Sequence, residues 1–230
     1  HQATVVIGAY GKRSRLDKQL DRAFIQQRAP YLGVKAHYAG DFPEDLVALH
    51  NFRGGYCGVS KVEDGRINIC YLADYAAFKE HKNLADFEQQ VVRQNPHLAA
   101  ILDRVTPLFD QPLTISQVSF ANKTLVEDGV LLAGDAAGMI HPLCGNGMGM
   151  AIGAAGLLVP LVTDFLQDRS TRQQLEQRYQ QQWRSQFRRR LLAGRLFNVA
   201  FQRDYLLAWA IAGLVRFPSL LPAIIRQTHA

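Results

Sequence analysis

Cysteine is scarce in this chain, and the few cysteines present are widely spaced. There are three of them in 230 residues, at positions 57, 70 and 144. An odd count without a CxxC motif argues against both a disulfide framework and a zinc site. We therefore expect no metal site, free thiols that are buried or half-buried, and a reducing, cytoplasmic environment.

Signals for export, for nucleic-acid binding and for a C-terminal membrane span are also lacking. The chain does not open with a basic stretch followed by an apolar one, as a signal peptide would. The apolar tail at 205–215 is too short to cross a bilayer. No nucleic-acid motif is present, so we expect no nucleic-acid partner.

Positive charge is unevenly distributed along the chain. The net charge is +6, and nine arginines lie between Asp164 and Asp204. We interpret these arginines as the solvated face of a long helix. A second interpretation stays open, in which they and the apolar tail bring a cytoplasmic protein into contact with an anionic membrane surface.

Apolar periodicity predicts strands and helices in alternating groups. Strands are expected at 3–9, 31–39, 46–52, 55–62, 66–73, 112–120 and 129–134, and helices at 14–24, at 78–103 in two pieces, at 147–167 and from 171 onward. Ser14 is the expected N-cap of the first helix, and Pro96 is expected to interrupt the second. The four strands between 31 and 73 are separated by turn signals, which indicates an antiparallel sheet.

The strand at 129–134 ends in Gly134-Asp135, the first half of an unusual stretch. The end of such a strand is the sheet edge where ligands of open α/β sheets bind. Gly134 allows another group to approach the backbone closely. The carboxylate of Asp135 can accept a hydrogen bond from the hydroxyl of a sugar-like chain.

A stiff, glycine-rich loop follows this strand. Pro142 stiffens the loop, and Gly145, Gly147 and Gly149 leave backbone N–H groups bare at the start of the next helix. Such a helix start stabilises an anion, so a flat heterocycle that becomes anionic on reduction would suit it. A tight turn packed for its own sake stays open, because Met150 breaks the dinucleotide pattern G-x-G-x-x-G.

The segment GDAAGMIHPLCGNGMGMAI (134–152) resembles the second flavin-contact motif of FAD-dependent oxidoreductases of the hydroxylase and geranylgeranyl-reductase superfamily. The resemblance implies that FAD is the cofactor. It also implies that Gly134 and Asp135 lie at the ribityl chain, that Pro142 lies beside the ring, and that Gly145, Asn146, Gly147 and Met148 present backbone N–H groups to the ring's pyrimidine edge.

A second segment, VVIGAYGKRS (5–14), resembles the middle motif of the same superfamily, G-A-D-G-x-x-S. Gly8, Gly11 and Ser14 fit this motif, but Tyr10 stands where the superfamily has Asp. The resemblance covers roughly residues 3–165, and the superfamily's opening G-x-G-x-x-G segment, which binds the ADP half of FAD, has no counterpart. We therefore expect weak FAD binding, or none, unless a missing N-terminal segment of the same protein is supplied.

The resemblance implies a fold class and a domain layout. The fold class is α/β with an α+β insert: a partial, Rossmann-like flavin-binding domain, an antiparallel-sheet substrate domain and C-terminal helices. The expected domains are residues 1–30 with 112–168, then 31–111, then 169–230. The stretch at 54–72 resembles the strand that covers the substrate pocket in geranylgeranyl reductases.

The expected activity is that of a flavin-dependent oxidoreductase acting on a large apolar or lipid-like substrate, foremost the reduction of a carbon–carbon double bond. Two alternatives stay open: an aromatic-ring monooxygenase that uses NAD(P)H as electron donor, and a flavin-free interaction module that keeps the scaffold. Tyr56 and His141 are the candidate catalytic residues, although a plain sheet tyrosine and a histidine at the pocket rim fit equally. Cys144, near a helix start, is a minor redox candidate with a lowered thiol pKa.

Overall fold

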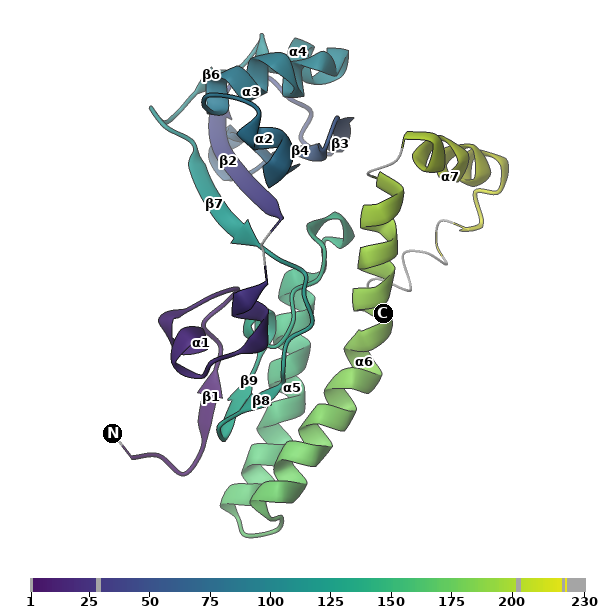
Figure 1. Ribbon diagram of the computed structural model, residues 1–230. Coiled ribbons are helices and arrows are strands. Elements are labelled where there is room, and N and C mark those ends of the chain that lie inside the picture. The colour runs from purple at the N-terminus through teal and green to yellow at the C-terminus, as the bar shows by residue number, and fades with distance from the viewer. Residues whose placement is uncertain (1, 28–29, 202–203, 221, 223–230) are drawn as a thin grey trace. The chain divides into compact units, whose positions relative to one another are not determined.

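The computed structural model describes residues 2–27, 30–201, 204–220 and 222. The chain forms two compact units, which we call the motif unit (residues 1–27 and 120–230) and the sheet unit (residues 28–119). Figure 1 shows the elements of both units along the chain. The α/β fold class, with an antiparallel insert and C-terminal helices, is confirmed.

The motif unit contains a small sheet and its long helices. Its elements are β1 (Val6–Gly8), α1 (Arg15–Gln19), β8 (Val126–Glu127), β9 (Val130–Leu132), α5 (Gly147–Leu166), α6 (Arg172–Phe201) and α7 (Asp204–Arg216), with short 3-10 turns at Ala23–Gln26, Gly134–Ala136 and Pro142–Cys144. The strands run in the order β1-β9-β8, and β1 is parallel to β9. Among the described residues, β1 is therefore an edge strand, and the loops after β1 and β9 leave the sheet at the same edge.

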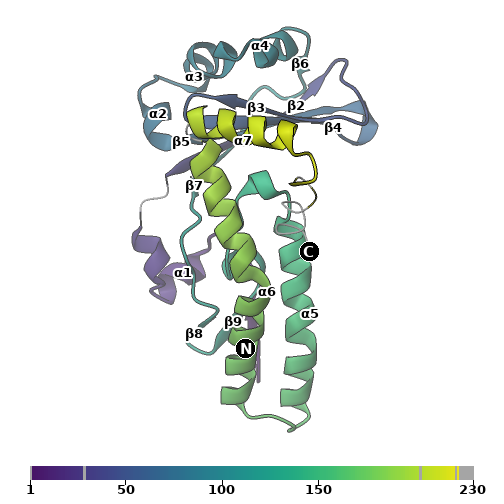
Figure 2. The ribbon, with the colours of Figure 1, turned by 90° about the vertical axis from the view of Figure 1, so that its right-hand side faces the viewer.

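Helices α5 and α6 pack side by side and cover the small sheet (Figures 1 and 2). Apolar side chains recur every four residues along α6, and Leu175, Tyr179, Trp183 and Phe187 of this stripe are buried, while Leu191 is half-buried. The hydroxyl of Tyr179 donates a hydrogen bond to the carbonyl of Leu132 on β9. This contact joins α6 directly to the strand that precedes the second motif.

Glycine lets these two helices approach each other. A Cβ added at Gly153 of α5 would lie 3.0 Å from Cζ of Phe187, whereas a Cβ at Gly156 would meet nothing within 4 Å. We expect Gly153→Ala to destabilise the protein by about 1–3 kcal/mol through overpacking. Gly156→Ala should stabilise it by about 0.5–1 kcal/mol, because alanine favours helix. Chemical denaturation of both variants tests this, and shifts of the same sign would contradict the packing described.

Helix α5 is the one described helix that is long and apolar enough to span a membrane by length and composition. Its buried face consists of Met150, Ala154, Leu158 and Leu161, which belong to the core shared with α6. Its other face exposes large apolar side chains, Met148 and Ile152 among them. A core helix of a soluble protein passes the same test, so the length and composition of α5 do not establish a span.

The sheet unit is an antiparallel sheet with helices on one face. Its elements are β2 (Tyr31–Ala39), β3 (Val47–Phe52), β4 (Gly55–Lys61), β5 (Ile67–Asp74), β6 (Thr106–Pro107), β7 (Leu113–Val118), α2 (Tyr75–Lys79), α3 (Leu84–Gln90) and α4 (Pro96–Leu102). The strand order is β3-β4-β5-β2-β6, and β7 also pairs with β2. Figure 2 shows α2, α3 and α4 on one side of this sheet. The helix-facing side chains, such as Val59 and Ile69, pack against Phe87 and Leu98.

Three local predictions differ from the structure for physical reasons. The helix expected at 14–24 keeps its Ser14 cap but ends at Gln19, since Asp21 takes a left-handed φ of 45° and Arg22 turns inward. Pro96 begins α4 instead of interrupting a helix, because proline at the first helical position sacrifices no backbone hydrogen bond. The strand expected at 112–120 is β7, which pairs with β2 and so lies in the sheet unit.

The predicted domain boundaries differ from the boundaries of the two units at β7 and at α6. The residues of β7 had been assigned to the flavin-binding part, and α6 had been assigned to a separate C-terminal region. In the structure, α6 shares one core with α5 and β9. Parts of the predicted ranges 1–30 and 169–230, at positions 1, 28–29, 202–203, 221 and 223–230, lie outside the described residues.

Candidate functional site

The loops that follow β1 and β9 border one groove of about 680 Å³ in the motif unit. From the predicted site it brings together Gly11, Gly134, Asp135, Gly147 and Met148. The rest of its lining is mostly apolar and comes from β1, from the residues directly after β1 and β9, and from α5. It consists of Ile7, Ala9, Ala133, Ala151, Ala155, Leu158, Val159, Val162 and Thr163. Residues more than 120 positions apart in the sequence thus share one cavity.

Bare backbone borders this groove. A Cβ added at Gly11 or Gly147 would meet nothing within 4 Å. Gly11 and Gly134 have φ angles of 80° and 60°, a region that glycine enters without strain. Gly147 and Met148 are the first two residues of the 20-residue helix α5, so their N–H groups have no carbonyl within the helix to bind. The helix dipole adds positive potential at this end.

Asp135 provides the acidic group at the groove. Burial raises the pKa of its carboxyl above the ordinary value, and the ammonium of Lys123 opposes that rise. The carboxylate is thus half-buried, lines the cavity and has a cation nearby. Such a group accepts hydrogen bonds from hydroxyls of a bound ligand.

The remaining residues of the predicted cofactor site lie outside the groove lining. A Cβ at Gly8 would lie 2.7 Å from Cδ2 of Leu132, so this glycine serves close packing of the strands. Ser14 caps α1 by accepting a hydrogen bond from the N–H of Leu16. The N–H of Gly145 donates to the carbonyl of Pro142 at 2.9 Å and is therefore engaged within the turn.

Asn146 is buried directly before α5. A side chain on Gly149, one turn further on, would collide with the side-chain amide of Asn146. Gly149 therefore makes room for a neighbouring side chain instead of exposing backbone to a ligand. The cofactor contacts predicted for Gly8, Ser14, Pro142, Gly145 and Asn146 stay predictions.

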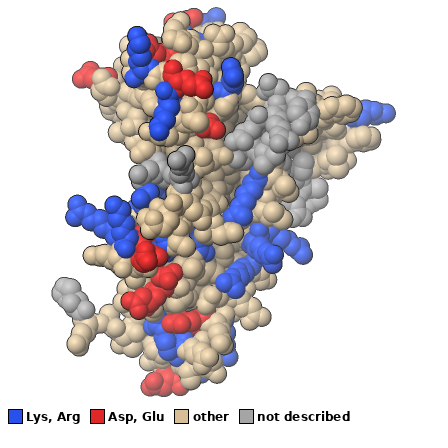
Figure 3. Space-filling view, viewed as in Figure 1, with Lys and Arg blue, Asp and Glu red and all other residues tan. Residues whose placement is uncertain are grey.

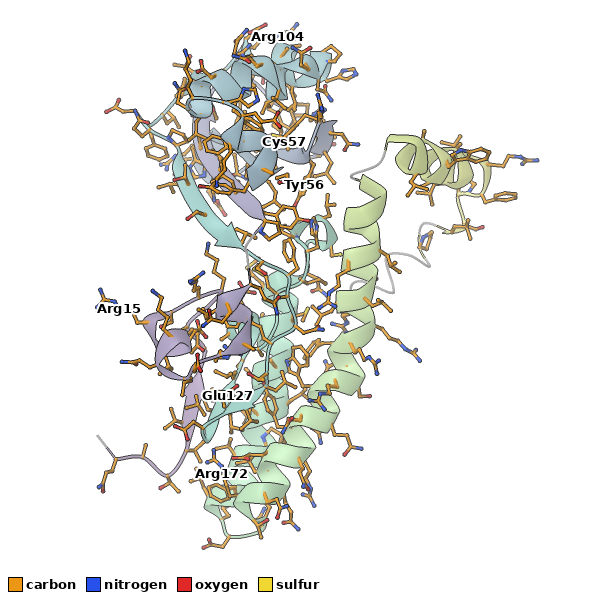
Figure 4. All side chains as sticks on the ribbon, in the orientation of Figure 1. Arg15, Tyr56, Cys57, Arg104, Glu127 and Arg172 are labelled. Carbon is orange, nitrogen blue, oxygen red and sulfur yellow. The ribbon has the colours of Figure 1, made fainter. Side chains whose placement is uncertain are left out.

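The candidate catalytic residues have different surroundings. His141 is 2% exposed and its ring lies 4.6 Å from that of Phe120, so it is a packed residue and not a rim residue. Burial raises the pKa of the Cys144 thiol, so the lowered pKa expected from a nearby helix start is wrong. Tyr56 belongs to the sheet unit, on β4, where Figure 4 labels it beside Cys57. Cys57 belongs to the core that the sheet shares with its helices. Consecutive strand residues lie on opposite faces, so Tyr56 lies on the sheet face opposite the helices.

A buried charge network, missed by the sequence analysis, supports the first motif. Asp17 accepts hydrogen bonds from the Tyr10 hydroxyl at 2.5 Å, from Nη1 of Arg22 at 2.7 Å and from the N–H of Ser14 at 2.7 Å. Nη2 of Arg22 donates to the carbonyl of Ala136 at 3.0 Å, and so reaches the second motif. Tyr10, which replaces the superfamily's Asp, thus obtains a carboxylate partner from the following helix.

A second connection between the motifs was missed as well. Nζ of Lys123 donates to the carbonyl of Lys12 and to the carbonyl of Asp135, both at 2.7 Å. No periodic pattern or motif marks a lone lysine in a loop, so the sequence offers no signal for it.

The groove has the kinds of groups that a flavin requires. It offers an acceptor for ribityl hydroxyls in Asp135, backbone donors at the start of α5, and apolar walls for a flat ring. FAD bound here would supply the redox chemistry, while the chain's residues bind and orient it. Gly138, within the second motif, has no room for a side chain: its Cβ would lie 2.9 Å from Cη2 of Trp183.

Comparison with known proteins agrees with this reading of the groove. Residues 2–194 match the family model described as an FAD binding domain. Conditioned medium factor receptor 1 of Dictyostelium discoideum is 25% identical over 232 residues, which are 97% of this chain and 41% of that protein.

Solved structures share the fold. PqsL, a probable FAD-dependent monooxygenase from Pseudomonas aeruginosa, matches with a TM-score of 0.61 and 19% identity, over 90% of this chain and 59% of that one. A geranylgeranyl bacteriochlorophyll reductase-like protein from Thermoplasma acidophilum matches with a TM-score of 0.68 and 20% identity, over 89% of this chain and 53% of that one. The chain spans less than two thirds of the length of each of these relatives. It belongs to the FAD-binding domain family, with FAD as its cofactor.

Proposed function

We propose that the intact protein is an FAD-dependent oxidoreductase that reduces a carbon–carbon double bond in a large apolar or lipid-like substrate. The observation that carries the flavin part is the shared groove, in which both motif loops and the start of α5 meet. The fold shared with a geranylgeranyl reductase-like protein supports the reductase class by analogy.

The sheet face opposite α2, α3 and α4 supports an apolar substrate. Register places Tyr56, Leu49 and Ile115 on that face, and the last two are 52% and 47% exposed. Exposed apolar side chains on the same face as a tyrosine support a lipid-like substrate that needs one polar contact. Tyr56 is the proposed proton donor or pocket-shaping residue, and His141, being buried, is proposed only to support the motif loop.

An NAD(P)H-dependent monooxygenase is the second candidate, favoured by the fold shared with PqsL. The two reactions differ in their use of oxygen. With substrate and NAD(P)H present, we expect anaerobic turnover and no stoichiometric oxygen uptake by the purified intact protein. One oxygen consumed per NAD(P)H, coupled to a hydroxylated product, would replace the reductase proposal with the monooxygenase. We do not propose the flavin-free alternative, because residues 2–194 match the FAD-binding domain family.

A preceding segment of the same protein is the proposed partner of the motif unit. β1 is an edge strand, and Val6 and Ile7 on it are each 46% exposed. The adjoining face of α5 is also apolar and exposed, with Met148 at 82%. A further parallel strand would pair with β1, and a helix after it would cover the part of this apolar surface that lies outside the groove. We propose that this segment also supplies the cradle for the ADP half of FAD.

We further propose that α6 and α7 bring this cytoplasmic protein to an anionic membrane surface. Trp209 and Val215 on α7 are 78% and 76% exposed. Figure 3 shows basic side chains gathered over α6, and Arg188 and Arg189 are exposed there. An apolar helix beside arginines suits a headgroup layer.

Liposome co-sedimentation tests the membrane proposal. We expect binding to phosphatidylserine vesicles that weakens as salt rises. Replacing Arg188 and Arg189 by Gln should reduce the binding constant about 30-fold, at about 1 kcal/mol for each charge, and Trp209→Ala should reduce it further. Arg66→Gln, in the sheet unit, is the control. Wild-type protein that stays in the supernatant at low salt would end the proposal.

A further inference from the structure

Lys123 connects two loops that are far apart in the sequence. Its ammonium donates to the carbonyl of Lys12, in the loop after β1, and to the carbonyl of Asp135, in the turn after β9. The same Nζ lies 4.4 Å from the ring centroid of Phe24. Two short charge-assisted hydrogen bonds and an aromatic face therefore surround one half-buried cation.

We propose that Lys123 is a positioning residue that fixes the spacing of the two motif loops and places a cation beside Asp135. This inference rests on the proposed flavin site and adds a residue that controls its geometry and its pH range. Lysine 123 lies outside the groove lining, so it acts through the loops and not by touching the ring.

The geometric part follows from where the two carbonyls lie. The loops leave neighbouring parallel strands, and the strand register ends at the pair Gly8 and Leu132. Beyond that pair, the sheet no longer fixes the distance between the loops. Arg22 binds the carbonyl of Ala136, and Lys123 binds the carbonyl before it as well as the opposite loop. Losing Lys123 removes one of the two connections between the loops, together with its hydrogen bonds to the carbonyls of Lys12 and Asp135.

The electrostatic part follows from the charges around Lys123. Burial and the neighbouring Arg22 lower the pKa of Lys123 to about 8, while Asp17 and Asp135 oppose this and Lys12 adds to it. Lys123 is thus a cation at neutral pH. It in turn is the charge that opposes the burial-induced rise in the pKa of Asp135. Removing the cation should therefore raise the pKa of the Asp135 carboxyl further.

The test uses the intact protein, with whatever residues flank this chain, and compares Lys123→Met, Lys123→Gln and Lys123→Arg. Lys18→Met, an exposed lysine on α1, is the matched control. Amide hydrogen exchange without added flavin is the first measurement. We expect faster exchange at 11–14 and at 134–138 together in the Met variant, and unchanged exchange in the Arg variant and the control.

FAD affinity measured from acidic to alkaline pH is the second measurement. We expect the Met and Gln variants to bind FAD about ten- to hundredfold more weakly near neutral pH. Their affinity should also begin to fall at a higher pH than that of the wild type, because Asp135 protonates earlier. The Gln variant keeps two N–H donors. If the Met variant fails to fold, the Gln variant is used for this measurement.

The outcomes separate this inference from the flavin assignment. Wild-type protein that binds no FAD would refute the flavin assignment, while the exchange data would still decide whether Lys123 ties the loops. Exchange that stays unchanged in both loops of the folded Met or Gln variant overturns the positioning role. If FAD affinity begins to fall at the same acidic pH in the variants as in the wild type, the electrostatic role of Lys123 is overturned.

Discussion

Replacing Asp17 by asparagine is expected to lower the free energy of unfolding by about 3–5 kcal/mol, since it leaves a buried charge without its partner. Arg22 is 2% exposed and Asp17 is fully buried, and their ion pair measures 2.7 Å. The amide can still accept a hydrogen bond but cannot neutralise the guanidinium. Denaturant unfolding followed by circular dichroism measures the loss.

Asp21→Asn is the matched control for this prediction. It makes the same chemical change four residues further on, at an exposed position, and asparagine tolerates the left-handed φ of 45° found there. We expect a change of less than about 0.5 kcal/mol. Equal effects at the two positions would mean that the Asp17–Arg22 pair does not hold the first motif in place.

Asp135→Ala is expected to weaken FAD binding to the intact protein by about a hundredfold, the effect of losing an ionised acceptor and its charge-assisted hydrogen bonds. Fluorescence titration measures the dissociation constant. Asp128→Asn, at an exposed position of the same unit, is the control and should bind FAD as the wild type does. Unchanged affinity in Asp135→Ala would remove the carboxylate from the site.

The same substitution should not destabilise the protein without FAD. Burial raises the pKa of Asp135 in the folded state, so between the ordinary pKa and the raised pKa the folded chain binds more protons than the unfolded chain, and stability falls as pH rises through that window. The ionised carboxylate therefore opposes folding at neutral pH. Its removal should change stability by less than about 1 kcal/mol, in the stabilising direction, after screening by water is considered. Together with lost binding, this result identifies a residue kept for function.

The glycines and the acidic residue of the groove were visible in the sequence because they form local motifs. Gly134 and Asp135 are adjacent, and the helix that follows starts at the predicted Gly147. The α6 stripe was visible for a similar reason, because one period of spacing marks it as core. Strand and helix types followed from these local patterns in most of the chain.

The supporting contacts were not visible, because they join distant residues. Arg22 reaches a carbonyl 114 positions away, and Lys123 reaches one 111 positions away. The unit boundary was missed for the same reason, since β7 belongs to the sheet unit only through its pairing with β2. The close packing of Gly138 against Trp183 was not visible either, because Trp183 comes from α6, far away in the sequence.

Hydrogen exchange of the intact protein with and without FAD tests the central claim most directly. The claim is that the loops after β1 and β9, with the first turn of α5, receive the flavin. We predict that saturating FAD slows amide exchange at 9–14 and at 134–148 together, and leaves the exposed end of α7 unchanged. Saturable FAD binding with no protection in either loop would contradict the account.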